Sequence, residues 1–138
     1  MECRPYDPST DASAFKGGEP GGVLWYPQVA AWTFCVQGIP VLAFGFRPLW
    51  EGVAFGWMET TADAQCYKMA IARQLDRMRP VLHQFRRVET LVYADNLPAQ
   101  RLNEWLGFQF CCRKVHYGPQ GETMLEYVWL KEGVADAR

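Results

Sequence analysis

The residues best suited to acid–base chemistry are two glutamates and two tyrosines in or beside apolar segments. Glu59 ends one apolar run and Glu89 lies in the next one, so either carboxylate can take a proton from an attacking nucleophile. Tyr93 and Tyr67 carry phenols that can return a proton to a leaving group. Each side chain also fits a plain solvent-facing role at the end of a strand or on a helix, and both interpretations stay open.

Cysteine and histidine form no familiar metal or nucleophile motif. The five cysteines, at 3, 35, 66, 111 and 112, are odd in number and include no Cys-x-x-Cys pair, so we predict neither a disulfide framework nor a structural metal site. Reduced thiols in the cytoplasm are expected. Cys111 and Cys112 could chelate a soft metal or sense oxidants, but neighbours on a strand point to opposite faces. His83 and His116 are expected on solvated surfaces.

Composition narrows the class of protein. The chain has 138 residues, of which 49% are hydrophobic, enough for one domain with a real core. Lys plus Arg (14) nearly cancels Asp plus Glu (15), which argues against nucleic acid as a partner. The longest apolar run, Val41–Phe46, is far shorter than the roughly 20 residues that cross a bilayer, and the first residues do not resemble a secretory signal. The one basic concentration can hold a phosphate or an acidic partner, or form a solvated face; it comprises Arg73, Arg77, Arg79, Arg86 and Arg87.

The elements that must position these residues begin with strands. An irregular segment is predicted over residues 1–28, with a short strand at 4–6, a weak helix at 7–16 and a glycine-rich loop at 17–22. Three strands of an antiparallel meander are predicted at 29–37, 41–47 and 53–59, with a turn at Gln37-Gly38 and a connection at 48–52.

The period then changes from two to about 3.6. Apolar residues from Tyr67 to Phe85 recur at steps of three and four, which indicates a long amphipathic helix that Pro80 should kink or end near Arg79. A strand at 88–94, a short helix from Pro98 to about Trp105, and strands at 108–117 and 123–131 follow, with a frayed tail from 132. A helix between two strands of one sheet indicates a parallel pair within an otherwise antiparallel sheet.

This element order, together with the segment from Val88 to Phe108, resembles the GNAT acetyltransferase superfamily. In that family a strand ends in an Asn, a short helix follows, and a Gly-Phe pair opens the next strand. Here Asn96 precedes Gly107 by 11 positions and Phe108 by 12, the spacing of the family. The resemblance by element order covers about residues 29–131. It implies an α+β fold: a mixed, mostly antiparallel twisted sheet of about six to seven strands, one long and one short helix, and a splayed parallel strand pair at the centre.

The resemblance also implies a site and a reaction. Acetyl-CoA would bind between the strands at 53–59 and 88–94, with the backbone of Met58 to Thr60 orienting the thioester. Its pyrophosphate would lie at the start of the long helix, near Thr61 and Ala62. By the same resemblance, Asn96 and Asn103, which follow the strand at 88–94, would also contact the cofactor. The acceptor would be a small-molecule or protein amine, with Glu59 or Glu89 as base.

Two departures from the family pattern bear on activity. The segment from Thr60 to Tyr67 has no glycine, and Thr60 with Asp63 fits a capping box whose side chains would occupy the helix's own donors. Asn103 stands where many family members have a tyrosine, and an amide cannot supply a proton as a phenol does. Both features weaken the prediction that the chain catalyses acyl transfer.

A looser resemblance links the chain to short GNAT-like proteins of tailed bacteriophages, on Arg4-Pro5, Trp57, Arg86-Arg87-Val88-Glu89 and Gly107-Phe108. Some of those proteins are virion components. It implies an alternative: a catalytically inactive structural or interaction module that contacts phage structural proteins or copies of itself, in the host cytoplasm or the virion. A CoA-binding regulator without turnover lies between the two.

Overall fold

The computed structural model describes residues 1–15 and 30–132. The predicted loop at 17–22, the first residue of the predicted strand at 29–37 and the predicted tail beyond 132 lie outside this part of the chain. Contacts group the chain into two units, Met1–Pro48 with Gly56–Arg77 and Leu49–Phe55 with Met78–Arg138, over their described residues. Each unit is described in turn.

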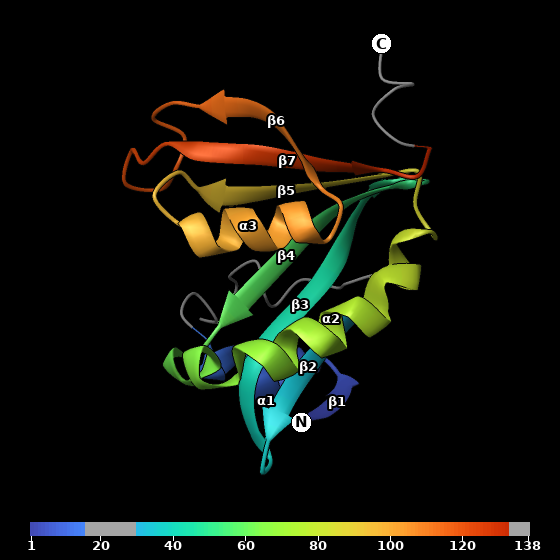
Figure 1. The fold of residues 1–138 in the computed structure, drawn as a ribbon, viewed down its shortest axis with the longest axis vertical. Helices are drawn as coiled ribbons and strands as arrows, with labels where there is room; N and C mark the ends of the chain where they lie inside the picture. The colour runs from blue at the N-terminus through green and yellow to red at the C-terminus, as the bar shows by residue number, and fades with distance from the viewer. Residues whose placement is uncertain (16–29, 133–138) are drawn as a thin grey trace. The chain divides into compact units, whose positions relative to one another are not determined.

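The first unit contains an antiparallel ribbon (Figure 1). Strand β2 pairs with β1 on one side and with β3 on the other. The turn between β2 and β3 has Gln37 at φ 52° and Gly38 at φ 78°, positive values at both central positions, as the tight turns of right-twisted hairpins require. The predicted turn is thus confirmed. The bounds are β1 Glu2–Pro5, β2 Ala30–Val36 and β3 Ile39–Trp50.

Aromatic rings fill much of the core of this unit. Phe44 stacks on Trp32 at 5.4 Å and meets Phe34 edge-on, also at 5.4 Å between ring centroids. Phe34 has no exposed surface and Phe44 very little. Because Trp32 pairs with Phe44 across the β2–β3 ladder and Phe34 is two positions further along β2, the three rings share one face of the ribbon.

A buried carboxylate fastens the N-terminal segment to this ribbon. Asp11 belongs to α1, Pro8–Asp11, and η1, Ala12–Ala14, follows it. Arg4 Nη1 and Nη2 donate to the two oxygens of Asp11 at 2.8 and 2.6 Å, and Thr33 Oγ1 donates to Oδ2 at 3.0 Å. Asp11 is fully buried, so these donors replace the water it loses on folding. The predicted short strand and weak helix in this segment correspond to β1 and α1.

One strand boundary was predicted wrongly. Residues 48–50 were expected in a connection, yet β3 continues through Trp50, and only Glu51 and Gly52 form the turn before β4. Pro48 and Trp50 are exposed, and a proline is tolerated where a strand faces solvent and its missing N–H costs no ladder bond.

The long helix begins with tighter turns than expected. η3, Ala62–Tyr67, is a 3₁₀ segment that leads directly into α2, Lys68–Leu82. The predicted apolar stripe is confirmed, because Ile71, Leu75 and Leu82 are buried. Pro80 lies inside α2, which ends two residues later at Leu82 rather than near Arg79. So close to the end, the proline removes a single intrahelical bond, which does not stop the last residues from remaining helical.

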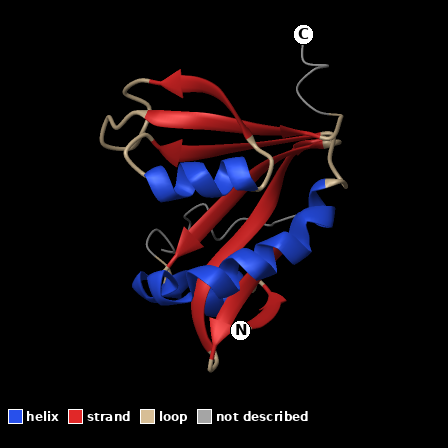
Figure 2. Cartoon of the chain, in the orientation of Figure 1, coloured by secondary structure: helices blue, strands red, loops and turns tan. Residues whose placement is uncertain are grey.

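The second unit is built on β5, which has a parallel and an antiparallel neighbour. β4 pairs with β5 in parallel at Val53–Arg87, Ala54–Val88 and Phe55–Glu89. β7 pairs with β5 antiparallel along the whole length of β5, and β6 pairs with β7. Figure 2 shows the three strands β5, β7 and β6 in red, with the α3 helix in blue beside them. The bounds are β4 Val53–Thr60, β5 Arg87–Tyr93, α3 Leu97–Trp105, β6 Gln109–Lys114 and β7 Met124–Leu130.

Helix α3 is fixed at both ends by the residues that the sequence singled out. Asn96 is its N-cap, and the Asn96 side-chain oxygen accepts from the Ala99 N–H at 3.2 Å. Gly107 has φ 96°, a left-handed conformation that glycine adopts without strain and that ends helices. The spacing from Asn96 to Gly107 is therefore the length of one capped short helix.

The hydrogen-bonded strand order is β1-β2-β3-β4-β5-β7-β6. It confirms the predicted α+β architecture: a mixed, mostly antiparallel sheet of seven strands with one parallel pair, β4 and β5, and one long helix between them in sequence. None of the described helices is both long and apolar enough to traverse a bilayer.

Candidate functional site

The parallel pairing between β4 and β5, the two strands that were expected to splay apart, is short. β4 has eight residues, but its pairing with β5 covers only Val53 to Phe55. The remaining residues, Gly56–Thr60, belong to the first unit. Strand β4 thus extends beyond its parallel ladder and ends in the segment that was predicted to orient a thioester, with Met58 and Thr60 exposed.

The predicted capping box at the start of the long helix is wrong. Thr60 is the last residue of β4, so Thr61 becomes the N-cap. Thr61 makes no side-chain cap hydrogen bond; its Oγ1 instead donates to the Val41 carbonyl at 3.3 Å, and its N–H donates to the same oxygen at 3.0 Å. Because the first N–H groups of a helix have no intrahelical partner, this end of η3 keeps donors that a capping box would have filled. Ala62 and Asp63 are exposed there.

Glu59 lies close to a tyrosine that sequence reasoning missed. Burial, followed by the charges of Asp11, Asp7 and Glu59, raises the pKa of Tyr6 to about 12. The Tyr6 ring also meets Trp57 edge-on at 5.3 Å, and the Tyr6 N–H donates to Ala31 O at 2.9 Å. Glu59 and Tyr6 are both half-buried in the first unit, and the Glu59 charge contributes the least of the three carboxylates to the raised pKa of Tyr6. The available signal was the N-terminal strand, which carries Tyr6 to the edge of β2.

Glu89 has a partner of its own. Its Oε1 lies 3.3 Å from Nε of Arg87, and both side chains are partly exposed. The two residues are two apart on β5, so they share one face of the strand. The Arg87 guanidinium therefore contacts the carboxylate of one of the two predicted bases.

The remaining predicted site residues of the second unit cluster around α3. Tyr93 is the last residue of β5, with 41% of its surface exposed. The Asn96 N–H donates to the Tyr93 carbonyl at 3.0 Å. Asn103 Nδ2 donates to Ala99 O at 3.0 Å, so its amide serves the helix itself. Glu89 and Tyr93 are not brought together, because they are four positions apart on β5, which separates them by roughly 13 Å.

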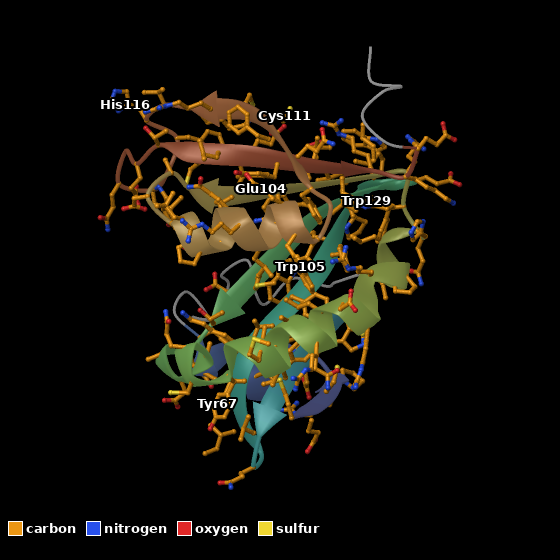
Figure 3. All side chains as sticks on the ribbon, in the orientation of Figure 1. Tyr67, Glu104, Trp105, Cys111, His116 and Trp129 are labelled. Atoms are coloured by element: carbon orange, nitrogen blue, oxygen red, sulfur yellow. The ribbon has the colours of Figure 1, made fainter. Side chains whose placement is uncertain are left out.

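Tryptophan and arginine meet at the end of α3. Arg79 Nη2 donates to the Trp105 carbonyl at 2.8 Å, and its guanidinium lies 4.5 Å from the Trp105 ring centroid. Figure 3 labels Trp105 and Trp129; His83 meets Trp129 edge-on at 5.2 Å and is otherwise exposed. His116 lies in the turn after β6, with φ 55°, rather than on the predicted strand. Of the basic residues, Arg79 and Arg87 are thus used in local contacts.

Solved structures with the same architecture come from acetyltransferases. An acetyltransferase of the GNAT family from Streptococcus pneumoniae matches with a TM-score of 0.71 at 11% identity, over 94% of this chain and 98% of that one. The F149A mutant of spermidine N-acetyltransferase SpeG from Vibrio cholerae matches with a TM-score of 0.67 at 12% identity, over 96% of each chain. The fold is the GNAT fold.

A third match links the fold to a cofactor in another protein. The yncA structure from Salmonella typhimurium, which contains acetyl-CoA, matches with a TM-score of 0.64 at 11% identity, over 74% of this chain and 64% of that chain. The present chain therefore spans less than two thirds of yncA. No protein-family model and no curated protein sequence matches this chain.

Within the GNAT fold, the residues of the first unit offer a coherent chemistry. Met58 and Thr60 at the end of β4 are exposed, the Thr61 side chain does not cap η3, and Glu59 places a carboxylate one residue before Thr60. Backbone amides can pair with an amide-containing chain, and helix N-termini favour anions. The exposed Asp63 carboxylate opposes an anion at that place.

Proposed function

We propose that the chain binds an acyl-CoA and transfers its acyl group to an amine. The observation that carries the proposal is the freed helix start: Thr61 caps η3 without using its side chain on the helix, so the N–H groups there are available to a pyrophosphate. The GNAT fold, shared with structures described as acetyltransferases, supports the same function.

In this reaction the amine nitrogen attacks the thioester carbonyl carbon, and the C–S bond then breaks. A base must remove one proton from the amine, and the leaving thiolate must gain one. Glu59 is the proposed base, because it lies at the end of β4 directly before Thr60 and the start of η3. Tyr93 remains the proposed proton donor, since its phenol is exposed at the end of β5. Tyr6 is a weaker candidate, because a pKa of about 12 holds its proton tightly.

Binding is tested by calorimetry with acetyl-CoA on the full chain. We expect a Kd tighter than about 1 mM, which corresponds to −4.1 kcal/mol. Ala62→Pro is the sharpest variant: it follows Thr61, whose φ of −91° and ψ of 169° suit a residue before proline. Proline is well accepted at the first position of a helix but lacks the N–H, so the affinity should fall about tenfold with unchanged melting temperature.

Three further variants separate the charge effect from the N–H effect. Ala62→Ser keeps the N–H and should bind acetyl-CoA as the parent chain does. Asp63→Asn removes the carboxylate beside the pyrophosphate and should tighten binding severalfold, whereas Glu2→Gln on β1 is a matched loss of one charge that should have no effect. Equal affinities for all four variants would show that the helix start is not the pyrophosphate site.

Turnover is tested with Glu59→Gln and Glu89→Gln against a panel of amines. Loss of the base should lower the rate by about tenfold to a thousandfold, and we expect this for Glu59→Gln but not for Glu89→Gln. If both variants keep the parental rate, neither residue is the base. Tyr93→Phe tests the proton donor in the same assay.

A second candidate function is an interaction module without turnover. It is favoured by large apolar side chains left in solvent, such as Trp50 with 64% of its surface exposed and Phe110 with 54%. Such aromatic residues are typical of protein contacts. Failure to bind acetyl-CoA, with recovery of the chain in fixed stoichiometry from a purified virion or another assembly, would favour this function. The acetyltransferase structures reported above lend no support to a virion role.

A further inference from the structure

A β-bulge at the edge strand β6 brings two thiols and a carboxylate together. Along the β6–β7 ladder, Phe110 pairs with Tyr127 and Cys112 pairs with Glu126, so Cys111 is the extra residue without a cross-strand partner. The expectation that Cys111 and Cys112 point to opposite faces is therefore wrong, because it assumed an unbroken strand. A bulge re-aims the side chains beside it.

The donor atoms of this cluster lie close to one another. The thiol sulfurs of Cys111 and Cys112 and a carboxylate oxygen of Glu126 are all within 4.8 Å of each other. Both cysteines are free and exposed, and Figure 3 shows Cys111 projecting from β6. All three residues belong to the second unit, and none of them has a role in the acyl-CoA proposal, so the cluster does not depend on it.

Two thiolates with one carboxylate form a donor set for a particular class of metal. Zinc takes sulfur ligands at about 2.3 Å and carboxylate oxygen at about 2.0–2.2 Å. Thiolates select thiophilic ions over magnesium and calcium. In a tetrahedral site, donors at those bond lengths lie about 3.5 Å apart, so side chains of this cluster would need to close by about 1 Å. The exposed side chains of Cys111 and Cys112 on the edge strand β6 can make that adjustment by small rotations.

We propose that Cys111, Cys112 and Glu126 bind a thiophilic divalent metal ion of the zinc class, leaving at least one coordination position for water. The cluster already contains a cation that such an ion would replace. Lys114 Nζ lies 3.4 Å from Glu126 Oε1, and it also lies 4.8 Å from the Tyr117 ring centroid. Lys114 can therefore release Glu126 and keep a favourable contact with the aromatic ring.

Oxidant sensing fits the same residues less well. Partial desolvation, then the neighbouring Glu126 carboxylate and Cys112 thiol, raise the pKa of Cys111. Oxidants react with thiolates, and sensor cysteines have lowered pKa values. A divalent cation, by contrast, stabilises the three negative donors together.

The test is a titration of the reduced full chain with Co²⁺, followed by competition with Zn²⁺. Thiolate ligation to Co²⁺ gives an intense near-ultraviolet absorption and tetrahedral visible bands. We expect a one-to-one complex with a Kd tighter than about 10 µM that Zn²⁺ displaces. Cys111→Ser and Cys112→Ser should each abolish the near-ultraviolet absorption at this concentration, and Glu126→Gln should weaken binding about tenfold.

The chain supplies its own controls. Cys3 and Cys66 are also exposed free thiols, so Cys3→Ser and Cys66→Ser should leave the spectrum unchanged. Lys114→Ala should tighten binding severalfold, since it removes the competing cation. Circular dichroism and melting curves verify that each variant is folded. The proposal is overturned if the parent chain does not bind Co²⁺ at 10 µM, or if the absorption survives in Cys111→Ser and Cys112→Ser.

Discussion

At the level of single side chains, Asp11 shows how one carboxylate can stabilise the N-terminal segment. Although desolvation opposes it, the hydrogen bonds from Arg4, Asp7 and Thr33 hold the pKa of Asp11 below its ordinary value. A carboxyl group whose folded-state pKa is lowered contributes stability above its unfolded pKa, near 3.9, and loses it as the pH falls through the folded value.

We therefore expect Asp11→Asn to lower the free energy of unfolding by about 3 kcal/mol at pH 7, because it leaves the Arg4 charge unpaired. The difference from the parent chain should shrink as the pH falls below about 4. Urea denaturation at pH 7, 5 and 3 measures both effects. A constant difference across this range would contradict the role given to the charge of Asp11. Asp7→Asn, at an exposed position of the same segment, is the matched control.

The pKa of Tyr6 is a second property of a single side chain, and it depends in part on the charge of Glu59. The pKa of Tyr6 is raised to about 12 by burial first and by three carboxylates second, among them Glu59. Glu59→Gln removes one negative charge and should lower the pKa of Tyr6 by a few tenths of a unit. The carbon-13 resonance of the labelled phenol ring, followed from pH 8 to 13, measures this midpoint. An unchanged midpoint in Glu59→Gln would show that the two side chains do not interact.

At the level of elements, the capped helix α3 separates a structural role of Asn96 from a binding role. The Asn96 side chain accepts from the Ala99 N–H, a bond whose loss typically costs about 0.5–2 kcal/mol. Asn96→Ala should lower stability by this amount, and Asn96→Asp should restore it, because an aspartate caps equally well. Thermal melting measures stability, and calorimetry with acetyl-CoA measures binding. Weaker acetyl-CoA binding by the stable Asn96→Asp variant would add a ligand role to the cap.

The helices were easier to predict from the sequence than the end of strand β4. The stripe through Ile71 and Leu75 was predictable, since helical periodicity is a local property. The spacing from Asn96 to Gly107 was likewise readable as a capped helix and as a family feature. The end of β4 could not be predicted in the same way. Threonine is suited both to a strand and to a helix N-cap, and in the structure Thr60 is the last residue of the strand.

Long-range pairing limited the prediction of the candidate sites. Tyr6 meets Trp57 on β4 only because the N-terminal strand pairs with β2, and nothing local to either residue encodes that pairing. The bulge at Cys111 is set by the register with β7, which a single strand does not specify. The candidate bases were therefore accessible from sequence in type and position, but not in their surroundings, and the capping box predicted at the start of the long helix was wrong.

At the level of the whole molecule, the boundaries between the two units fall inside secondary-structure elements. The chain passes from one unit to the other within β3 after Pro48, within β4 after Phe55, and within α2 after Arg77. Unfolding either unit alone would break all three elements. We therefore expect one cooperative transition.

Single-tryptophan variants test this expectation in urea. One keeps Trp57, which is buried in the first unit, and the other keeps Trp129, which is buried in the second. Their fluorescence midpoints should coincide with each other and with the far-ultraviolet circular dichroism of the same variant. Separate midpoints within one variant would mean that the units unfold independently, and that the expected single domain behaves as two.

The irregularity in β6 has one more consequence, for the behaviour of the protein at high concentration. β6 is the last strand of the sheet and all but one of its residues are exposed, so it offers a template on which a second chain could extend the sheet. An interrupted ladder and the charges of Arg113 and Lys114 make that template a poor one. Deleting Cys111 would join the two halves of the ladder into a straight strand, and light scattering should then detect fibrous or oligomeric assemblies that the parent chain avoids.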